Sequence, residues 1–337
     1  MTNLEINGRG DLDTSREAHP STPEFAVAGA PSYPRTLFLG TAGLRPGWGL
    51  AFYAVIFLIL QRIAVDLAWS RDFGASGLWS SLLAEVGSLL AAVIPAMVLA
   101  RVEQRPWRAY GLPSRTAFGP LFWTGGLWGF TFVSLLILAL YGARSFSFGH
   151  LALHGVRIAK FAVFWAVFFL IVGLFEEFLL RGYSQFTLSR GIGFWPAAVA
   201  LSSTFGLIHL KNDEEHWPGL LAAAFIGLFF CLTLRRTGNL WFAVGFHAAW
   251  DWGETFFYSV PDSGMTSPGH LLSSSLRGPQ WLSGGSTGPE GSIFCFAVIA
   301  LAWALFARIY RHGDTSGAGS LPEPLGSPHR PQSTPPQ

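Results

Sequence analysis

The chain contains little charge. Of its 337 residues, only 12% are Asp, Glu, Lys or Arg, whereas soluble domains carry roughly 25%. This deficit excludes an ordinary soluble domain, and a net charge of +2 gives no basis for nucleic-acid binding. Apolar residues take the place of the missing charge, because 50% of the chain is hydrophobic, with 30 Phe and 14 Trp. This composition predicts an integral membrane protein.

Cysteine is almost absent as well. Cys231 and Cys295 both lie in apolar runs, so we predict small buried hydrophobes rather than a disulfide framework or a zinc cluster. The His-Glu-x-x-His spacing of zinc peptidases does not occur. Both ends of the chain are polar. We therefore predict a disordered tail over residues 1–45, which does not resemble a signal peptide, and a second one over 312–337.

Residues 46–311 are predicted to form one helical membrane domain. A spanning helix needs about 20 mostly apolar residues, and by this criterion the fold is an all-α polytopic bundle of about eight transmembrane helices. The predicted spans lie near 49–69, 78–100, 118–141, 161–188, 194–210, 218–235, 240–258 and 291–309. Arg and Lys are enriched in the loops on the side of the termini, which predicts cytoplasmic termini and a plasma-membrane location.

The stretch Leu-Phe-Glu-Glu-Phe-Leu-Leu-Arg places charge inside a predicted span. Ionisable groups at membrane depth are costly and are functional candidates by default. Glu177 and Arg181 are four residues apart, so they share a helix face and neutralise each other. Glu176 points about 100° away, and we predict that it is unpaired and free to act as a general base or acid. A structural ion pair with a snorkelling carboxylate is the alternative.

Two further motifs place histidines in the membrane. Phe205 and His209 lie one helical turn apart, and so do His247 and Asp251. Glu177 and His209 lie 16 positions on either side of the turn between the fourth and fifth helices. At 1.5 Å per residue they reach a similar depth, ~24 Å along the helix axis. His247 and Asp251 reach a comparable depth from the next turn, so the three motifs are predicted to meet inside the membrane.

Two chemistries fit these residues. Glu176 and His209 can hold and deprotonate a water molecule while His247 and Asp251 bind the oxyanion, a set that performs peptide hydrolysis. Alternatively, His209, His247 and Asp251 hold zinc, with a glutamate as the base. Two functions without catalysis stay open, namely a membrane scaffold or immunity-type protein and a transporter that relays protons.

The order of the motifs resembles the CAAX-protease and bacteriocin-processing (CPBP, Abi) family of intramembrane proteases. The patterns E-E-x-x-x-R, F-x-x-x-H and H-x-x-x-N/D stand here at 176–181, 205–209 and 247–251. The segment 105–112, RPWRAYGL, is similar to the family's Arg…Gly-Leu stretch. Each motif alone is weak, but three in this order in a chain of about eight predicted spans are specific.

The resemblance implies a helical bundle with a conical intramembrane cavity and a glutamate-based active site. In that family's arrangement Glu176 activates water with help from His209, and His247 with residue 251 forms the oxyanion site. The implied catalytic residues are Glu176, His209, His247 and Asp251, and the implied supporting residues are Glu177, Arg181 and Phe205.

One position departs from the family pattern. Asp251 stands where many members have Asn, and an ionised Asp cannot donate a hydrogen bond to an oxyanion. Asp251 is therefore protonated, or orients His247, or ligates a metal. The resemblance further implies a membrane-embedded or lipidated peptide substrate, prenylated or not. A metal-independent mechanism is favoured, and zinc held by His209, His247 and Asp251 is the alternative.

Overall fold

The structure is a computed structural model, and it describes residues 37–40, 43–70 and 77–311. The predicted tail over 312–337 and residues 1–36 of the other predicted tail lie outside the described residues. Within the rest of that tail, β1 (Leu39–Gly40) and β2 (Gly43–Leu44) pair as a short antiparallel hairpin. Regular structure therefore begins before the predicted domain boundary at residue 46.

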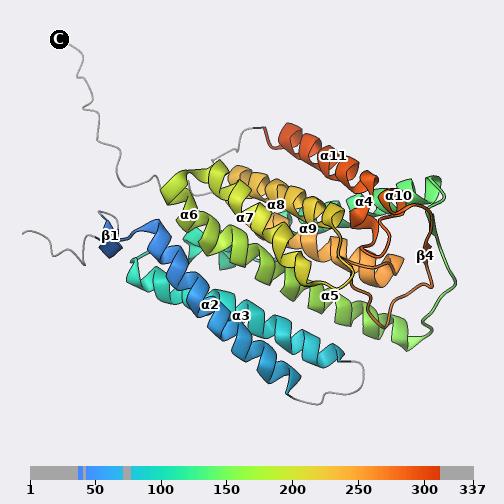
Figure 1. The fold of residues 1–337 in the computed structure, drawn as a ribbon, viewed down its shortest axis with the longest axis horizontal. Helices are drawn as coiled ribbons and strands as arrows, with labels where there is room; N and C mark the ends of the chain where they lie inside the picture. The colour runs from blue at the N-terminus through green and yellow to red at the C-terminus, as the bar shows by residue number, and fades with distance from the viewer. Residues whose placement is uncertain (1–36, 41–42, 71–76, 312–337) are drawn as a thin grey trace, which may run out of the picture. The chain divides into compact units, whose positions relative to one another are not determined.

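Helices occupy most of the described chain, and one lies at each of the eight predicted span positions (Figure 1). Two of the eight continue into π-helical turns. The long elements are α2 (Pro46–Trp69), α3 (Leu78–Val102), α4 (Pro120–Gly142), α5 (Val156–Glu177) with η3 (Phe178–Ser184) and α6 (Gln185–Ile192), α7 (Phe194–Ile208), α8 (Trp217–Thr237), α9 (Trp241–Trp252) with η5 (Gly253–Tyr258), and α11 (Ile293–Ile309). The short ones are η1 (Trp107–Tyr110), η2 (Ser114–Thr116), η4 (His209–Lys211), α10 (Gln280–Ser283) and η6 (Pro289–Gly291).

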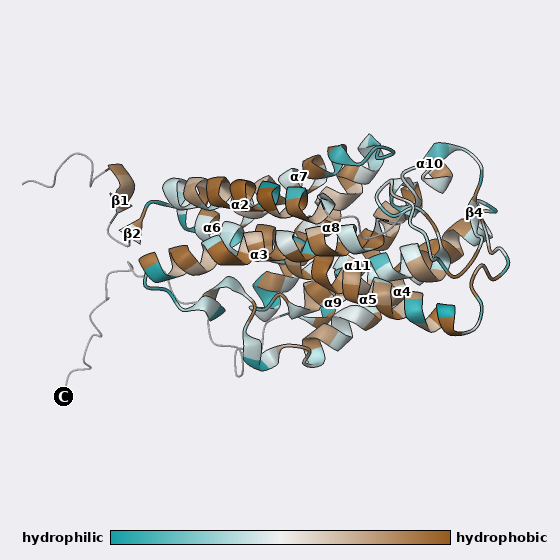
Figure 2. Cartoon of the chain, turned by 90° about the horizontal axis from the view of Figure 1, so that it is seen from below, coloured by the Kyte–Doolittle hydropathy of each residue, from teal (hydrophilic) through white to brown (hydrophobic). Residues whose placement is uncertain are grey.

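The outward faces of the helices are apolar. Val55, Leu58 and Ile63 on α2 are each more than half exposed, an arrangement that is unfavourable in water and normal against lipid. Figure 2 shows the same hydrophobic colouring along the helices and hydrophilic colouring concentrated in the connecting segments. In the described chain, 5 helices are long and apolar enough to cross a membrane. The prediction of an all-α polytopic membrane protein is confirmed.

Close packing against α4 fixes the position of α9. A Cβ on Gly125 or Gly129 of α4 would collide with the backbone carbonyl oxygen of Phe242 or Phe246 on α9, and Gly245 of α9 meets the backbone of α4 in the same way. Glycines four residues apart let membrane helices approach this closely. The contact sets the depth and rotation of the helix that carries the third motif.

The two π-helical segments adjoin the motifs. η3 begins directly after Glu177, and inside it Gly182 departs from helical geometry, with φ −81° and ψ −112°. η5 directly follows α9. Single π-helical turns inside helices are rare and occur frequently at functional sites.

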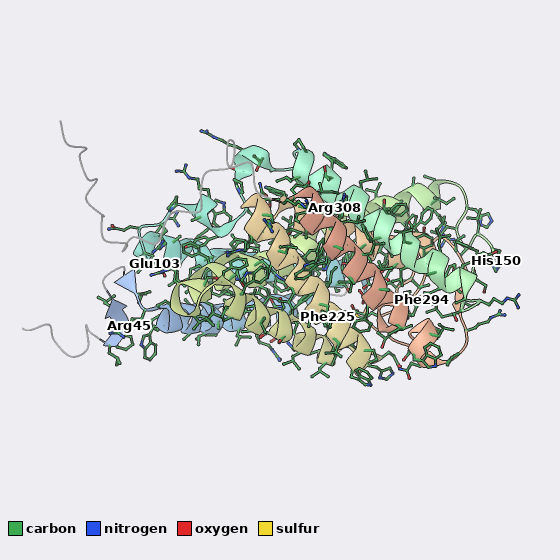
Figure 3. All side chains as sticks on the ribbon, turned by 90° about the horizontal axis from the view of Figure 1, so that it is seen from above. Arg45, Glu103, His150, Phe225, Phe294 and Arg308 are labelled. Carbon is green, nitrogen blue, oxygen red and sulfur yellow. The ribbon has the colours of Figure 1, made fainter. Side chains whose placement is uncertain are left out.

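The long segment 261–290 is held at the end of the bundle opposite the N-terminal hairpin. Its strand β4 (Ser275–Leu276) pairs antiparallel with β3 (Phe146–Ser147), which precedes α5. Figure 3 shows His150 at this end, with Arg45 and Glu103 at the other. Strand pairing therefore anchors this segment to the bundle.

Candidate active site

A cavity of about 700 Å³ opens between the helices that carry the three motifs. Glu176, His209, His247 and Asp251 all line it, and so does Phe205. Its walls come from α2, α3, α5, α7, α8, α9 and α11, with residues from the segment 262–268 at one end. The structure thus brings the three motifs to one space, although they lie on three separate helices.

The ion pair expected from the first motif is present and buried. An Nη1 hydrogen of Arg181 is donated to Oε1 of Glu177 at 3.2 Å, and neither side chain is accessible to solvent. The guanidinium also lies 4.5 Å from the ring centroid of Phe205, a cation–π contact. A Cβ on Gly227 of α8 would occupy the space of that guanidinium. Glu177, Arg181 and Phe205 therefore link α5, α7 and α8 beside the cavity.

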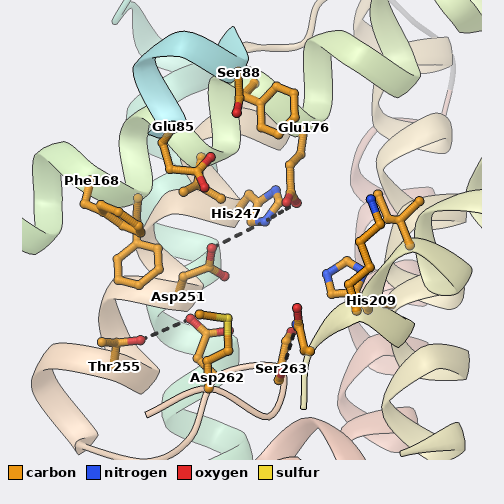
Figure 4. A pocket seen from close by; sticks show the side chains of 18 of the residues that line it. Glu85, Ser88, Phe168, Glu176, His209, His247, Asp251, Thr255, Asp262 and Ser263 are labelled. Carbon is orange, nitrogen blue, oxygen red and sulfur yellow. Dashed lines mark hydrogen bonds and ion pairs between the residues drawn. The ribbon is translucent and has the colours of Figure 1, made fainter. Parts of the chain in front are cut away.

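His247 is the central residue of the site. Its Nδ1 lies 3.2 Å from Oε1 of Glu177, which orients the ring. Its Nε2 lies 3.4 Å from Oδ2 of Asp251 and 3.6 Å from Oε2 of Glu176. The sequence prediction that Glu176 is unpaired was wrong, because helix pairing across the bundle places this histidine beside it. Figure 4 shows the Glu176 carboxylate and the His247 ring turned toward one another.

His209 approaches the cavity from another side. Its Nδ1 lies 2.7 Å from the backbone carbonyl oxygen of Phe205, so Nδ1 carries the proton and Nε2 is left as an acceptor. In Figure 4 the ring lies across the open space from Glu176 and His247. The last residue of α7 precedes His209, which begins the 3-10 turn η4. A water molecule or a peptide carbonyl group can therefore stand between this ring and Glu176.

Several acids at the cavity were not predicted from the sequence. Glu85 of α3, Asp262 and Glu290 line it, and Glu254 is buried on η5 next to Thr255, which also lines it. Glu85 is a lone carboxylate in its predicted span, and Glu254 lies in the same predicted span as Asp251; both were signals that could have been used. Asp262 and Glu290 are loop residues that no local pattern distinguishes.

The groups that could hold a metal differ from the predicted set. Among the described residues, three carboxylates, Glu254, Asp262 and Glu290, form a group close enough to share one ion. His209, His247 and Asp251 do not appear together in such a group. Cys231 and Cys295 are free and buried, as predicted.

Comparison with known proteins supports the resemblance. Residues 158–253, which contain all three motifs, match the family model described as type II CAAX prenyl endopeptidase Rce1-like. Comparisons with curated proteins and with solved structures gave no match. Over this segment, the chain is similar to the CAAX-protease family of intramembrane proteases, the family that its three motifs resemble.

Proposed function

We propose that the chain is an intramembrane endopeptidase in which a glutamate and a histidine activate water. One observation carries this proposal: Glu176, His209, His247 and Asp251 line a single cavity inside the bundle, with open space between His209 and the other three. General bases and oxyanion donors that face a shared reacting position are the arrangement that peptide hydrolysis requires.

In the proposed reaction, Glu176 takes a proton from a water molecule whose other contact is Nε2 of His209. The hydroxide adds to the peptide carbonyl carbon and leaves a negative oxygen. His247, in its doubly protonated form, donates from Nε2 to that oxygen while its Nδ1–H stays on Glu177. The C–N bond then breaks, and the proton held by Glu176 passes to the leaving amine. The 3.6 Å between Glu176 and His247 is of the loose kind seen before a substrate tightens a site.

Asp251 acts in this scheme through His247. Its Oδ2 lies 3.4 Å from Nε2 of that ring, so an ionised Asp251 stabilises the imidazolium, and a protonated one donates to the oxyanion as Asn does in many family members. Glu177 is a positioning residue, because it contacts both the histidine and Arg181 and does not line the cavity.

The proposed substrate is a membrane-embedded or lipidated peptide, prenylated or unprenylated. The cavity supports this class because aromatic side chains, among them Phe57, Phe168 and Phe175, share its walls with the acids and histidines. Apolar walls with a few polar groups are typical of sites for apolar ligands. We further propose that the termini are cytoplasmic in a plasma membrane, as the distribution of Arg and Lys predicts.

We favour a mechanism without a metal. His209 lies on the other side of the cavity from His247 and Asp251 (Figure 4), and Nδ1 of His247 is already engaged by Glu177. Zinc held by His209, His247 and Asp251 is the alternative that the following experiment separates.

The test is peptidase activity of the purified full chain in lipid, on a panel of prenylated and unprenylated membrane peptides. Wild type is compared with Glu176→Gln, which keeps the shape and removes the base, and with Glu214→Gln, which changes an exposed loop acid. We expect cleavage by wild type and Glu214→Gln, with and without chelator, and a loss of at least about 100-fold in Glu176→Gln. Unchanged cleavage by folded Glu176→Gln refutes the mechanism. Loss on chelation that zinc restores supports the metal alternative.

A further inference from the structure

Three carboxylates meet beside the cavity although none belongs to the three motifs. Glu254 comes from η5, Asp262 from the segment after it, and Glu290 from η6, just before α11. One oxygen atom of each lies within 4.8 Å of the others. Figure 4 shows Asp262 at the edge of the pocket, beyond Asp251. Segments far apart in the sequence thus bring negative charge to one point.

Glu254 is the residue that requires a partner. Its side chain is 0% exposed, and neither carboxylate oxygen has a hydrogen-bond partner. The other two acids are oriented by donors, because Thr255 Oγ1 donates to Asp262 at 3.1 Å and Ser263 Oγ donates to Glu290 at 2.7 Å. A buried carboxylate with both oxygens unsatisfied is strongly unfavourable unless a proton or a cation compensates it.

Negative charge dominates around Glu254. The charges that act on Glu254 are those of Glu290, Asp262 and Asp251, which are all carboxylates. In the part of the chain that the structure describes, none of Glu254, Asp262 and Glu290 forms an ion pair with Lys, Arg or His. A buried acidic cluster of this kind offers only oxygen ligands.

We propose that Glu254, Asp262 and Glu290 bind a divalent cation of the calcium class, separate from the catalytic residues. Oxygen-only ligands select hard cations such as Ca²⁺ and Mg²⁺ over zinc. Ca²⁺ binds oxygen at roughly 2.4 Å, so two ligands on opposite sides of it stand about 4.8 Å apart, whereas Mg²⁺ at about 2.1 Å allows about 4.2 Å. Every pair of the three ligand oxygens lies within 4.8 Å, so a single Ca²⁺ can contact all three. Water molecules complete the coordination.

The bound cation would fasten the edge of the cavity. Asp262 begins the stretch 262–268 that lines one end of the cavity, and Glu290 lines it as well. Glu254 lies one helical turn after Asp251 and is fixed in the bundle. A cation shared by the three carboxylates would therefore connect the segment 262–268 and the residues just before α11 to η5. This connection would fix the shape of the entrance to the active site.

The test is cation-dependent thermal stability of the purified full chain in detergent or nanodiscs, stripped of metal beforehand. We expect CaCl₂ to raise the unfolding midpoint, with a folded-to-unfolded ratio about 100-fold higher at a concentration 100 times the Kd. MgCl₂ is expected to act more weakly. Glu254→Gln should abolish the rise, and Asp213→Asn, which alters an exposed acid on another loop, should keep it. No rise in wild type, or an equal rise in Glu254→Gln, overturns the proposal, since the three acids are then neutralised by protons.

A second readout covers the case in which Glu254→Gln does not fold. TbCl₃ replaces CaCl₂, because Tb³⁺ takes the same oxygen ligands and emits light when a nearby indole is excited. Trp250 lies one helical turn before Glu254, so its indole is close to the proposed ion, and tryptophan excitation should give Tb³⁺ emission that excess CaCl₂ removes. Trp250→Phe should weaken the emission and keep the calcium-dependent rise in the midpoint. Emission that CaCl₂ does not displace, or no emission, counts against the site.

Discussion

Removing Glu177 should damage the fold more than removing its neighbour Glu176. Glu177 is fully buried and accepts hydrogen bonds from Arg181 and His247, each at 3.2 Å. The Glu177→Ala chain would leave the guanidinium buried without its carboxylate. Breaking a buried ion pair on one side costs about 3–5 kcal/mol. Glu176 has a side chain that is 19% exposed and a single contact at 3.6 Å, so its loss should cost less than about 1 kcal/mol.

The assay is thermal unfolding of both purified variants in the same detergent. At about 2–4 °C per kcal/mol for a large domain, Glu177→Ala should lower the midpoint by roughly 6–20 °C, and Glu176→Ala should leave it within about 4 °C of wild type. A double variant, Glu177→Gln with Arg181→Met, tests the cause, because removing both partners should restore part of the loss. Equal midpoints for the two single variants, or no recovery in the double variant, would refute this account of the ion pair.

Three further outcomes are expected. Burial is the main cause that raises the pKa of Glu215 from 4.5 to about 8. The folded state therefore binds a proton that the unfolded state releases, so without divalent cations the contribution of this group to stability is complete below pH about 4.5 and is lost as the pH rises through about 8. Glu215→Gln should flatten this dependence of the unfolding midpoint on pH. Gly227→Ala should cost about 1–3 kcal/mol in unfolding because its Cβ meets a buried guanidinium, whereas Gly142→Ala, with open space around it, should be neutral by the same assay. Asp251→Asn should keep peptidase activity within about tenfold of wild type, because the amide can donate a hydrogen bond to an oxyanion, whereas Asp251→Ala should lose about 100-fold or more. Equal losses of activity in the two variants would exclude a role for residue 251 at the oxyanion.

The sequence predicted the local features well because they depend on near neighbours. A spacing of four residues on a helix is enough to pair Glu177 with Arg181, and the pair is there at 3.2 Å. Counting residues from shared turns predicted that the motifs meet, and residues of all three line one cavity. Helix positions followed from apolar runs, although η3 and η5 interrupt two of them.

Relations across the bundle were not predictable in this way. The partner of Glu176 is His247, 71 positions later in the chain, because the α4–α9 glycine contact and the packing of α5 turn that ring toward it. The predicted sharing of a water between Glu176 and His209 stays a proposal, since the two residues face each other across the cavity (Figure 4). Glu85 carried a signal that went unused, as a lone carboxylate in an apolar run.

The sequence alone establishes that this is a polytopic helical membrane protein and shows which three helices carry the three motifs. Hydrophobicity and helical spacing are properties of contiguous residues, so they can be read without knowing any neighbour in space. Only the tertiary structure decided that three carboxylates surround His247 and that Glu254, Asp262 and Glu290 converge beside it. Those contacts join residues from different helices and loops, and their distances depend on how closely glycine-lined helices approach one another.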